Sequence, residues 1–286
     1  MRMNTTTSRP ARRRAATPVV AAVRVALRVY LLQLRRMREY GANFLAALLN
    51  IPVLMVVTFF VWKIVFGGRR EVNGYSFAQV IAYYILLRLV WLVVENAGTV
   101  SGQIWRDINS GDLGTYLARP LDYQLYGFAR TAGPASLFLA AGLVAYAGVA
   151  WVFGLPHAFT ADRLAFFLAS VAGGFALWYL FQSLLGLAAF WIGRPDTLRD
   201  LAWEFYALFS GLIVPNDFLP GLLRAAADAL PFKYLYYLPV AGLLGRLTAA
   251  EMARAAAGQA AWVVGLFLAT RIVWARGVRR FEAQGG

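Results

Sequence analysis

Residues 77–100 read FAQVIAYYILLRLVWLVVENAGTV, and this stretch decides the class of protein. Only two of its side chains are charged, Arg88 and Glu95, and both lie among aliphatic and aromatic neighbours. A helix needs about 20 mostly apolar residues to cross the hydrocarbon core of a bilayer. The stretch therefore predicts a membrane-spanning helix.

The rest of the chain repeats this pattern. Of its 286 residues, 60% are hydrophobic and 15% are charged, and the mean hydropathy is +0.57. Soluble domains are about 45–50% apolar and about 25% charged. The sequence predicts an all-α membrane protein with six transmembrane helices, at residues 42–66, 77–100, 128–153, 164–192, 201–214 and 259–274. The fifth is short because a proline follows it.

Two segments precede the first span. Residues 1–18 are rich in arginine and predict a basic, disordered tail, for which anionic lipid is the nearest polyanion. Residues 19–41 place Val23, Leu27 and Leu31 at helical spacing, with arginines on the opposite side. Such a helix is too charged to span a membrane but suits the headgroup plane. The chain thus divides into a tail, an interfacial helix and a transmembrane domain at residues 42–286.

Residues 215–244 contain four prolines, which divide the segment into short pieces. Residues 219–230 and 232–244 are semi-apolar, yet each is too short to cross a bilayer. Broken helices at membrane depth are tolerated where protein buries them. We therefore expect re-entrant helices before the last span.

The distribution of basic residues predicts the orientation. With six spans both termini share one side, and that side receives 19 basic residues against 7 on the other. Positive charge favours the cytoplasmic side. Both termini are expected in the cytoplasm, although most of the difference comes from the two ends of the chain.

Several kinds of active site are excluded by composition. The chain has no cysteine and one histidine, His157, so neither a metal cluster nor a Ser-His pair is expected. Neither Lys63 nor Lys233 has the context of a phosphate-binding loop. We expect no catalytic residue, and any energy from ATP must come from a separate subunit.

Among the charged side chains within predicted spans, Arg88, Glu95 and Glu204 are the ones singled out as an intramembrane polar group or gate. Arg88 and Glu95 are seven residues apart and share one helix face, about 10 Å apart along the axis. Intramembrane charges face a partner or a water-filled cavity. They form either the polar lining of a path or gate, or ion pairs that orient helices, and the sequence leaves both open.

Residues 101–126 are the most polar stretch between two spans. Arg106, Asp107, Asp112 and Arg119 give the stretch charge, and a short amphipathic helix there could dock on a soluble partner. A solvated loop is an equally good interpretation. The aromatic residues that begin the fifth span could grip an apolar substrate, although packing is the commoner role.

Four local runs resemble one family. They are Tyr40-Gly-Ala-Asn-Phe44, Asn73-Gly-Tyr-Ser76, Ile108-Asn-Ser-Gly-Asp-Leu-Gly-Thr-Tyr-Leu-Ala-Arg-Pro-Leu121 and Arg280-Phe-Glu-Ala-Gln-Gly-Gly286. With the order of spans, they make the chain after Val19 similar to ABC-2-type permeases, the membrane subunits of ABC exporters. Within that family it looks most like the bacterial viologen-exporter permeases. The third run is the most specific, and Gly41 departs from the first.

The resemblance implies a mechanism and partners. A coupling helix within residues 101–126 would dock on an ABC ATPase, present in two copies, through Ile104, Arg106, Asp107, Asp112 and Arg119. No cofactor binds this chain directly, because ATP and Mg²⁺ sit on the ATPase. Two permeases, as a homodimer or a paralogous pair, would pack through spans one and five. The substrate path or dimer interface would lie near Asn50, Phe59, Phe205, Tyr206 and Phe209.

The resemblance also implies the cargo and the place. The chain would sit in a bacterial cytoplasmic membrane and move a hydrophobic, amphipathic or cationic organic substrate outward. Membrane lipids are expected partners and nucleic acid is not. The competing interpretation is an ATP-independent channel, or a scaffold that recruits a soluble partner through the same loop. A lipid-modifying enzyme is a third, and few polar groups support it.

Overall fold

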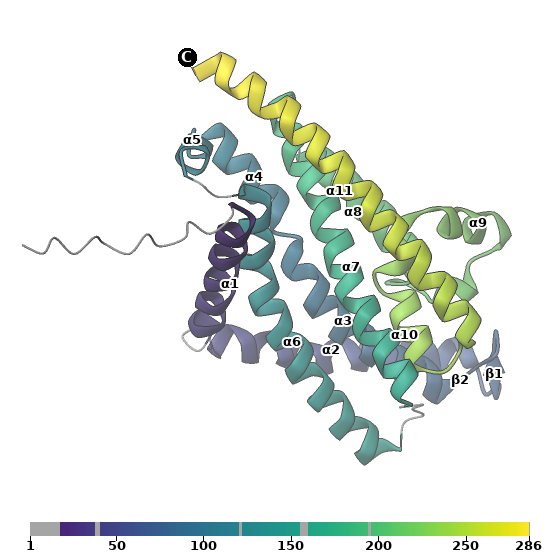
Figure 1. The fold of residues 1–286 in the computed structure, drawn as a ribbon. Coiled ribbons are helices and arrows are strands. Elements are labelled where there is room, and N and C mark those ends of the chain that lie inside the picture. The colour runs from purple at the N-terminus through teal and green to yellow at the C-terminus, as the bar shows by residue number, and fades with distance from the viewer. Residues whose placement is uncertain (1–17, 38–40, 120–121, 155–159, 194–195, 286) are drawn as a thin grey trace, which may run out of the picture.

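The computed structural model describes residues 18–37, 41–119, 122–154, 160–193 and 196–285. Within these ranges the side chains of residues 18–21, 37, 41–51, 153, 196 and 282–285 are not described. The described chain is helical apart from one small hairpin, so the predicted all-α class is confirmed (Figure 1).

The long elements follow the predicted spans with shifted ends. They are α1 (Pro18–Met37), α2 (Gly41–Phe66), α3 (Phe77–Val94), α6 (Tyr123–Phe153), α7 (Ala161–Leu187), α8 (Asp196–Phe209) and α11 (Ala249–Gly285). The short ones are β1 (Glu71–Val72), β2 (Tyr75–Ser76), α4 (Val100–Asn109), α5 (Leu113–Leu117), α9 (Gly221–Ala229), α10 (Tyr237–Leu243) and the 3-10 turns η1 (Glu95–Ala97), η2 (Ala188–Phe190), η3 (Asn216–Phe218) and η4 (Pro231–Tyr234).

The structure refines three parts of the predicted pattern. Helix α3 ends at Val94, and the turn η1 joins it to α4 within one helical stretch from Phe77 to Asn109. The last helix is far longer than the apolar stretch 259–274, because the alanine-rich residues before it are strong helix formers. The segment 101–126, left open between a short helix and a loop, forms most of α4, then α5 and the start of α6.

Four helical stretches among the described residues are long and apolar enough to cross a membrane. They run from Phe77 to Asn109, Tyr123 to Val152, Ala161 to Phe190 and Ala249 to Phe281. In α2 the part with described side chains gives an apolar stretch at Pro52–Phe66, which is shorter than these four. The 14 residues of α8 span about 21 Å, less than the ~30 Å of a hydrocarbon core.

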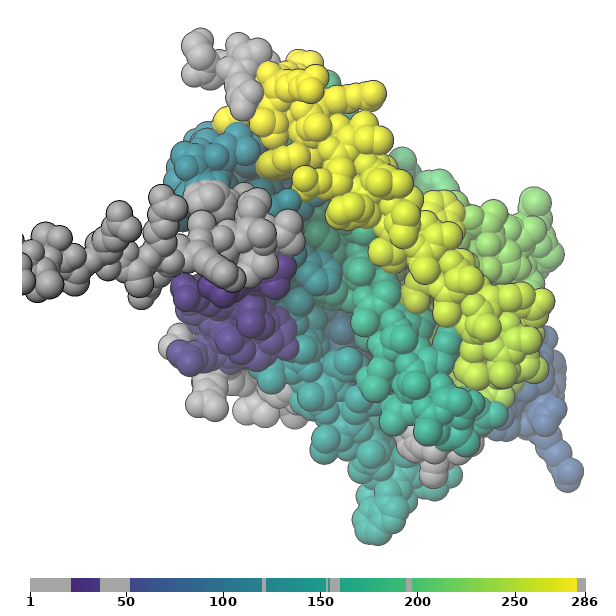
Figure 2. Space-filling model, in the orientation of Figure 1, coloured from purple at the N-terminus to yellow at the C-terminus, as the bar shows by residue number. Residues whose placement is uncertain are grey.

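Helix α7 lies at the centre of the bundle and packs against α3, α4, α10 and α11 (Figure 1). In Figure 2, α11 runs along α7 on the face that is visible, with α1 at the opposite edge. The closest approach to α4 occurs at Gly186, where a Cβ would lie 2.8 Å from the carbonyl oxygen of Ser101 and 2.9 Å from Ile104 Cβ. Glycine is therefore required there for α4 to lie on α7.

Helix α1 packs along α6 rather than standing alone. Gly133 of α6 meets the backbone of Tyr30, and the Tyr30 hydroxyl lies 2.8 Å from Ser136 Oγ. The side of α1 away from α6 leaves Val23, Leu27 and Leu31 about half exposed, so the apolar stripe expected from the sequence is free to contact lipid. This geometry is what an interfacial helix needs.

The regular helix is interrupted between α8 and α10, and the backbone carbonyls that lose their helical partners there accept hydrogen bonds from other groups. The hydroxyls of Tyr83 and Tyr84 on α3 donate to the carbonyls of Gly211 and Ile213 at 2.8 and 2.7 Å. The Asn216 amide donates to the Phe209 carbonyl, and the Tyr237 N–H donates to the Ser210 carbonyl. Irregular backbone at membrane depth is tolerated only when protein buries it in this way.

The hairpin β1–β2 was not predicted, but its turn is explained by its sequence. Glu71 faces Ser76 and Val72 faces Tyr75, which leaves a two-residue turn. Asn73 and Gly74 there have φ values of +49° and +71°. A turn with both residues at positive φ favours Asn-Gly and matches the twist of a hairpin.

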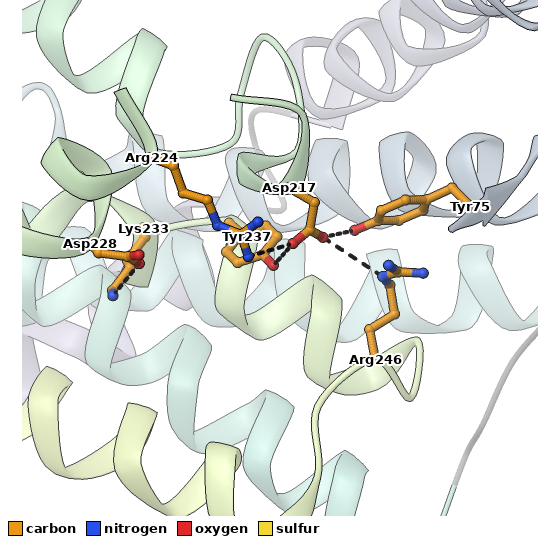
Figure 3. A network of polar contacts seen from close by, with 7 residues as sticks. All are labelled: Tyr75, Asp217, Arg224, Asp228, Lys233, Tyr237 and Arg246. Carbon is orange, nitrogen blue, oxygen red and sulfur yellow. Dashed lines mark hydrogen bonds and ion pairs between the residues drawn. The ribbon is translucent and has the colours of Figure 1, made fainter. Parts of the chain in front are cut away.

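Asp217 joins this hairpin to the broken segment (Figure 3). Its carboxylate accepts hydrogen bonds from the hydroxyls of Tyr75 and Tyr237 at 2.6 and 2.8 Å. Arg246 and Arg224 lie 3.8 and 3.5 Å from the same carboxylate, and Arg246 also donates to the Gly74 carbonyl. Burial and the Asp217 hydrogen bond raise the pKa of Tyr75, so this phenol remains a donor.

Substitution of Gly186 tests the contact between α4 and α7. Gly186→Ala should lower the melting temperature of the purified protein, because overpacking of a tight helix contact costs about 1–3 kcal/mol. Gly148→Ala on α6 is the matched control, since its Cβ would meet nothing within 4 Å. Equal melting temperatures for the two variants would contradict the close approach.

Substitution of Asp217 tests the junction at the hairpin. Asp217→Asn should destabilise the protein by about 2 kcal/mol or more, because two phenols lose a charged acceptor. Asp228→Asn is the control, because its ion pair with Lys233 is exposed and such pairs contribute at most about 1 kcal/mol. If the hydrogen bonds of Asp217 with Tyr75 and Tyr237 did not stabilise the protein, the two variants would have the same melting temperature.

Candidate functional site

The segment α4–α5 has one buried and one exposed face. Ile104 and Asp107, both expected at a partner surface, are only 3% and 5% exposed. The Asp107 carboxylate accepts hydrogen bonds from the Tyr123 hydroxyl and the Gln103 amide, each at 2.6 Å. These two side chains therefore hold α4 against α6 and α7 rather than face outward.

The exposed face carries the other three charged residues predicted for coupling. Arg106 is exposed on α4 and donates to Gln103 Oε1 at 3.1 Å. Asp112 is exposed between α4 and α5 and accepts a hydrogen bond from Ser110 Oγ at 2.8 Å. Arg119 is exposed just after α5. The segment α4–α5 thus exposes both positive and negative side chains on one face, while its other face is buried against the bundle.

The segment α4–α5 is also tied to three other parts of the molecule. The Trp105 indole N–H donates to the Gly193 carbonyl at 2.8 Å, which joins α4 to the end of the α7 region. Tyr123, at the start of α6, stacks on Trp274 of α11 with ring centroids 5.1 Å apart. Arg271 of α11 pairs with Asp122 at 2.7 Å. Nothing in the sequence spacing of Trp105 and Trp274 indicated these partners.

The three intramembrane charges occupy different environments. Arg88 is half-buried on α3, and its buried Nε has no partner among the described residues. Glu95 begins η1, and its buried Oε2 also lacks a partner there. Glu204 is exposed on α8. The ion pairs among the described residues join none of the three.

Glu95 lies beside a polar cavity of about 300 Å³. The cavity is enclosed by the junction of α3 and α4, by α7 and by α8. Glu204, although one residue from a lining tryptophan, does not line it. A second, larger cavity of about 640 Å³ opens between α6, α7 and α11 and is almost entirely apolar.

The residues expected near a path or dimer interface divide into two groups. Phe59 on α2 and Phe205 on α8 are 40% and 50% exposed. Tyr206 and Phe209 are buried, and the Tyr206 ring lies 4.5 Å from that of Trp178 in the bundle core. Tyr206 and Phe209 therefore face the core rather than an open path, while the side chain of Asn50 lies outside the described residues.

The part of the chain that the structure describes holds no group of three or more His, Cys, Asp or Glu side chains that could bind a metal ion. His157 lies outside that part. The described site consists of an exposed, charged face of α4–α5 at one end of the helical bundle and a polar cavity beside Glu95.

Comparison with known protein families assigns the chain to a family. The family model described as ABC-2 family transporter protein matches residues 53–285, which is most of the chain. A search of the curated proteins finds no significant match. The match includes the hairpin, α4–α5, the broken segment and α11, and the chain belongs to the ABC-2 family of transporter proteins.

Proposed function

We propose that this chain is the transmembrane permease subunit of an ATP-driven ABC exporter, close to the viologen-exporter-like permeases. Membership of the family makes it a multi-pass membrane component of a transporter, which works with an ABC ATPase. The observation that carries the proposal further is the segment α4–α5. Its charged face is exposed, while its other face is fixed to α6 and α7.

A segment built in this way can transmit force. ATP binding closes the ATPase subunits against each other, and a docked α4–α5 moves with them. Because Gly186 and Asp107 fix α4 to the bundle, the displacement passes directly to α6 and α7. A solvated loop would absorb the same displacement, so rigidity is the property that supports a coupling role.

The proposed topology has six spans, with both termini in the cytoplasm of a bacterium. Helix α2 supplies the first span, and α8 supplies a short fifth one that the broken segment completes as a re-entrant pair. Helix α1, packed on α6, lies in the headgroup plane of the inner leaflet. The bias of 19 basic residues to 7 supports this orientation.

Two permeases and two ATPase subunits make up the proposed assembly. Helix α2 exposes an apolar face that includes Val56, Phe60 and Ile64, and α8 exposes Leu201 and Phe205. These faces are suited to a second permease, with the substrate path between the two copies. The cargo is a hydrophobic, amphipathic or cationic organic molecule.

The competing function is a channel or scaffold that works without ATP. It would use the same exposed segment to recruit a soluble partner. The two differ in whether an ATP-hydrolysing subunit binds, which a purification can decide.

Reversal of charge on α4–α5 tests the proposal. The double variant Asp112→Lys/Arg119→Glu should release the ATPase that co-purifies with the tagged wild-type chain from its native host. Like charges brought together across an interface cost several kcal/mol, so we expect a loss of tenfold or more in recovered ATPase. Membrane insertion should be unchanged, because both side chains are exposed.

The matched control reverses two exposed charges at the hairpin, Arg69→Glu/Glu71→Lys. This variant should retain the ATPase fully. Equal recovery from both double variants would contradict docking at α4–α5, and a wild-type chain that never brings an ATPase with it would favour the channel or scaffold.

A further inference from the structure

The cavity beside Glu95 has an unusual lining for a space inside an apolar bundle. It holds about 300 Å³ and is lined by Glu95, Trp178, Gln182, Arg199, Asp200 and Trp203. Ligand sites are mostly apolar or aromatic, with a few polar groups that fix orientation. Two tryptophans and one carboxylate are the groups that attract organic cations.

Buried acceptors in this cavity lack hydrogen-bond partners. Glu95 Oε2 and Gln182 Oε1 are both buried, and neither has a partner among the described residues. Trp178 Nε1, a donor, is also buried without a partner among the described residues. A buried polar group without a partner costs about 1–3 kcal/mol, and more when it is charged. Two orphaned acceptors in one cavity indicate a ligand that brings N–H donors.

Among the charged residues that line the cavity, Glu95 has no ion-pair partner within 4 Å among the described residues. Arg199 and Asp200 lie 4.0 Å apart at the exposed edge and offset each other. Arg88 does not line the cavity, and it lies about 10 Å from Glu95 along the helix axis. A Cβ at Gly98 would collide with the Glu95 carboxylate, so the glycine leaves room for that group. The formal charges of the lining, from Glu95, Arg199 and Asp200, sum to one negative unit when Glu95 is ionised.

The depth of the site fits a ligand taken from the α4–α5 side. Glu95 follows Phe77 by 18 residues, which is about 27 Å of helix. A hydrocarbon core is about 30 Å thick, so Glu95 lies near its boundary on the side opposite the hairpin. Trp203, 41% exposed on α8, borders the opening. A compact cationic head could enter here while an apolar tail stays among the helices.

We infer that this cavity binds the ammonium head of an organic amine, with Glu95 and Gln182 accepting its N–H groups and Trp203 as an aromatic wall. The inference rests on the proposed function in so far as the bound amine is the cargo. Binding to the permease alone does not require the ATPase, so the two can fail separately.

The experiment compares two probes of equal size, 2-phenylethylammonium and 2-phenylethanol. Their binding is measured by calorimetry at neutral pH, with the full chain in nanodiscs of phosphatidylcholine and with empty discs subtracted. The neutral lipid avoids attraction of the cation to the membrane surface. The ammonium should bind about tenfold or more tightly than the alcohol, because only the cation offsets the charge of Glu95.

Two variants locate the site. Glu95→Gln keeps the shape of the side chain and should weaken binding of the ammonium by about tenfold or more, while binding of the alcohol should not change. Trp203→Leu should weaken the ammonium about fivefold through loss of a cation–π contact. Glu71→Gln, the same change on the exposed hairpin, should leave both probes unaffected.

Each outcome decides between two claims. Equal affinities for the two probes, or an ammonium affinity that Glu95→Gln does not change, would overturn the ammonium site even if the ATPase co-purifies. Charge-selective binding lost in Glu95→Gln would support the site, even if no ATPase were found and the exporter proposal failed.

Discussion

The structure depends on satisfying the backbone where the chain breaks between α8 and α10. A carbonyl that is freed by such a break and shielded from water costs about 1–3 kcal/mol if it finds no donor. Tyr83 and Tyr84 meet this need from α3, and their hydroxyls fix the distance between α3 and the end of α8. The adjacent loop then lies where Asp217 can reach the hairpin. Thus a helix too short to cross the core becomes part of a closed bundle.

Helix α3 connects this constraint to the opposite end of the molecule. Its tyrosines hold the broken segment, while Glu95 follows its last turn and opens onto the cavity. The chain continues directly into α4, whose buried face rests on Gly186 of α7. The cavity therefore lies between α4–α5 and the tyrosine contacts, and α3 and α7 connect the elements at the two ends of the bundle.

The all-α membrane class and most of the helices could be predicted from hydropathy, because a run of about 20 apolar residues is typical of a membrane-spanning helix. Asp107 and Tyr206 show where that reasoning stops. Their residue types suggested a partner surface and a path, yet both are buried, and burial depends on which helices become neighbours. The hairpin was missed because each strand has only two residues, although Asn73-Gly74 was a usable signal. Glu95 was singled out from the sequence as an intramembrane charge, but its cavity could not be, because residues from three elements distant in sequence line it.

The length of α11 determines which bilayers the protein can occupy. Its 37 residues extend about 55 Å, against a hydrocarbon core of about 30 Å. Four arginines near its end, Arg271, Arg276, Arg279 and Arg280, favour the headgroup level and anchor that end. At the other end, Glu251 and Arg254 lie in the first turns, so the charge-free part of α11 runs only from residue 255 to residue 270. These 16 residues extend about 24 Å, less than the hydrocarbon core, so Arg254 and Arg271 reach toward the two headgroup layers and the spacing between them sets the bilayer thickness that suits α11.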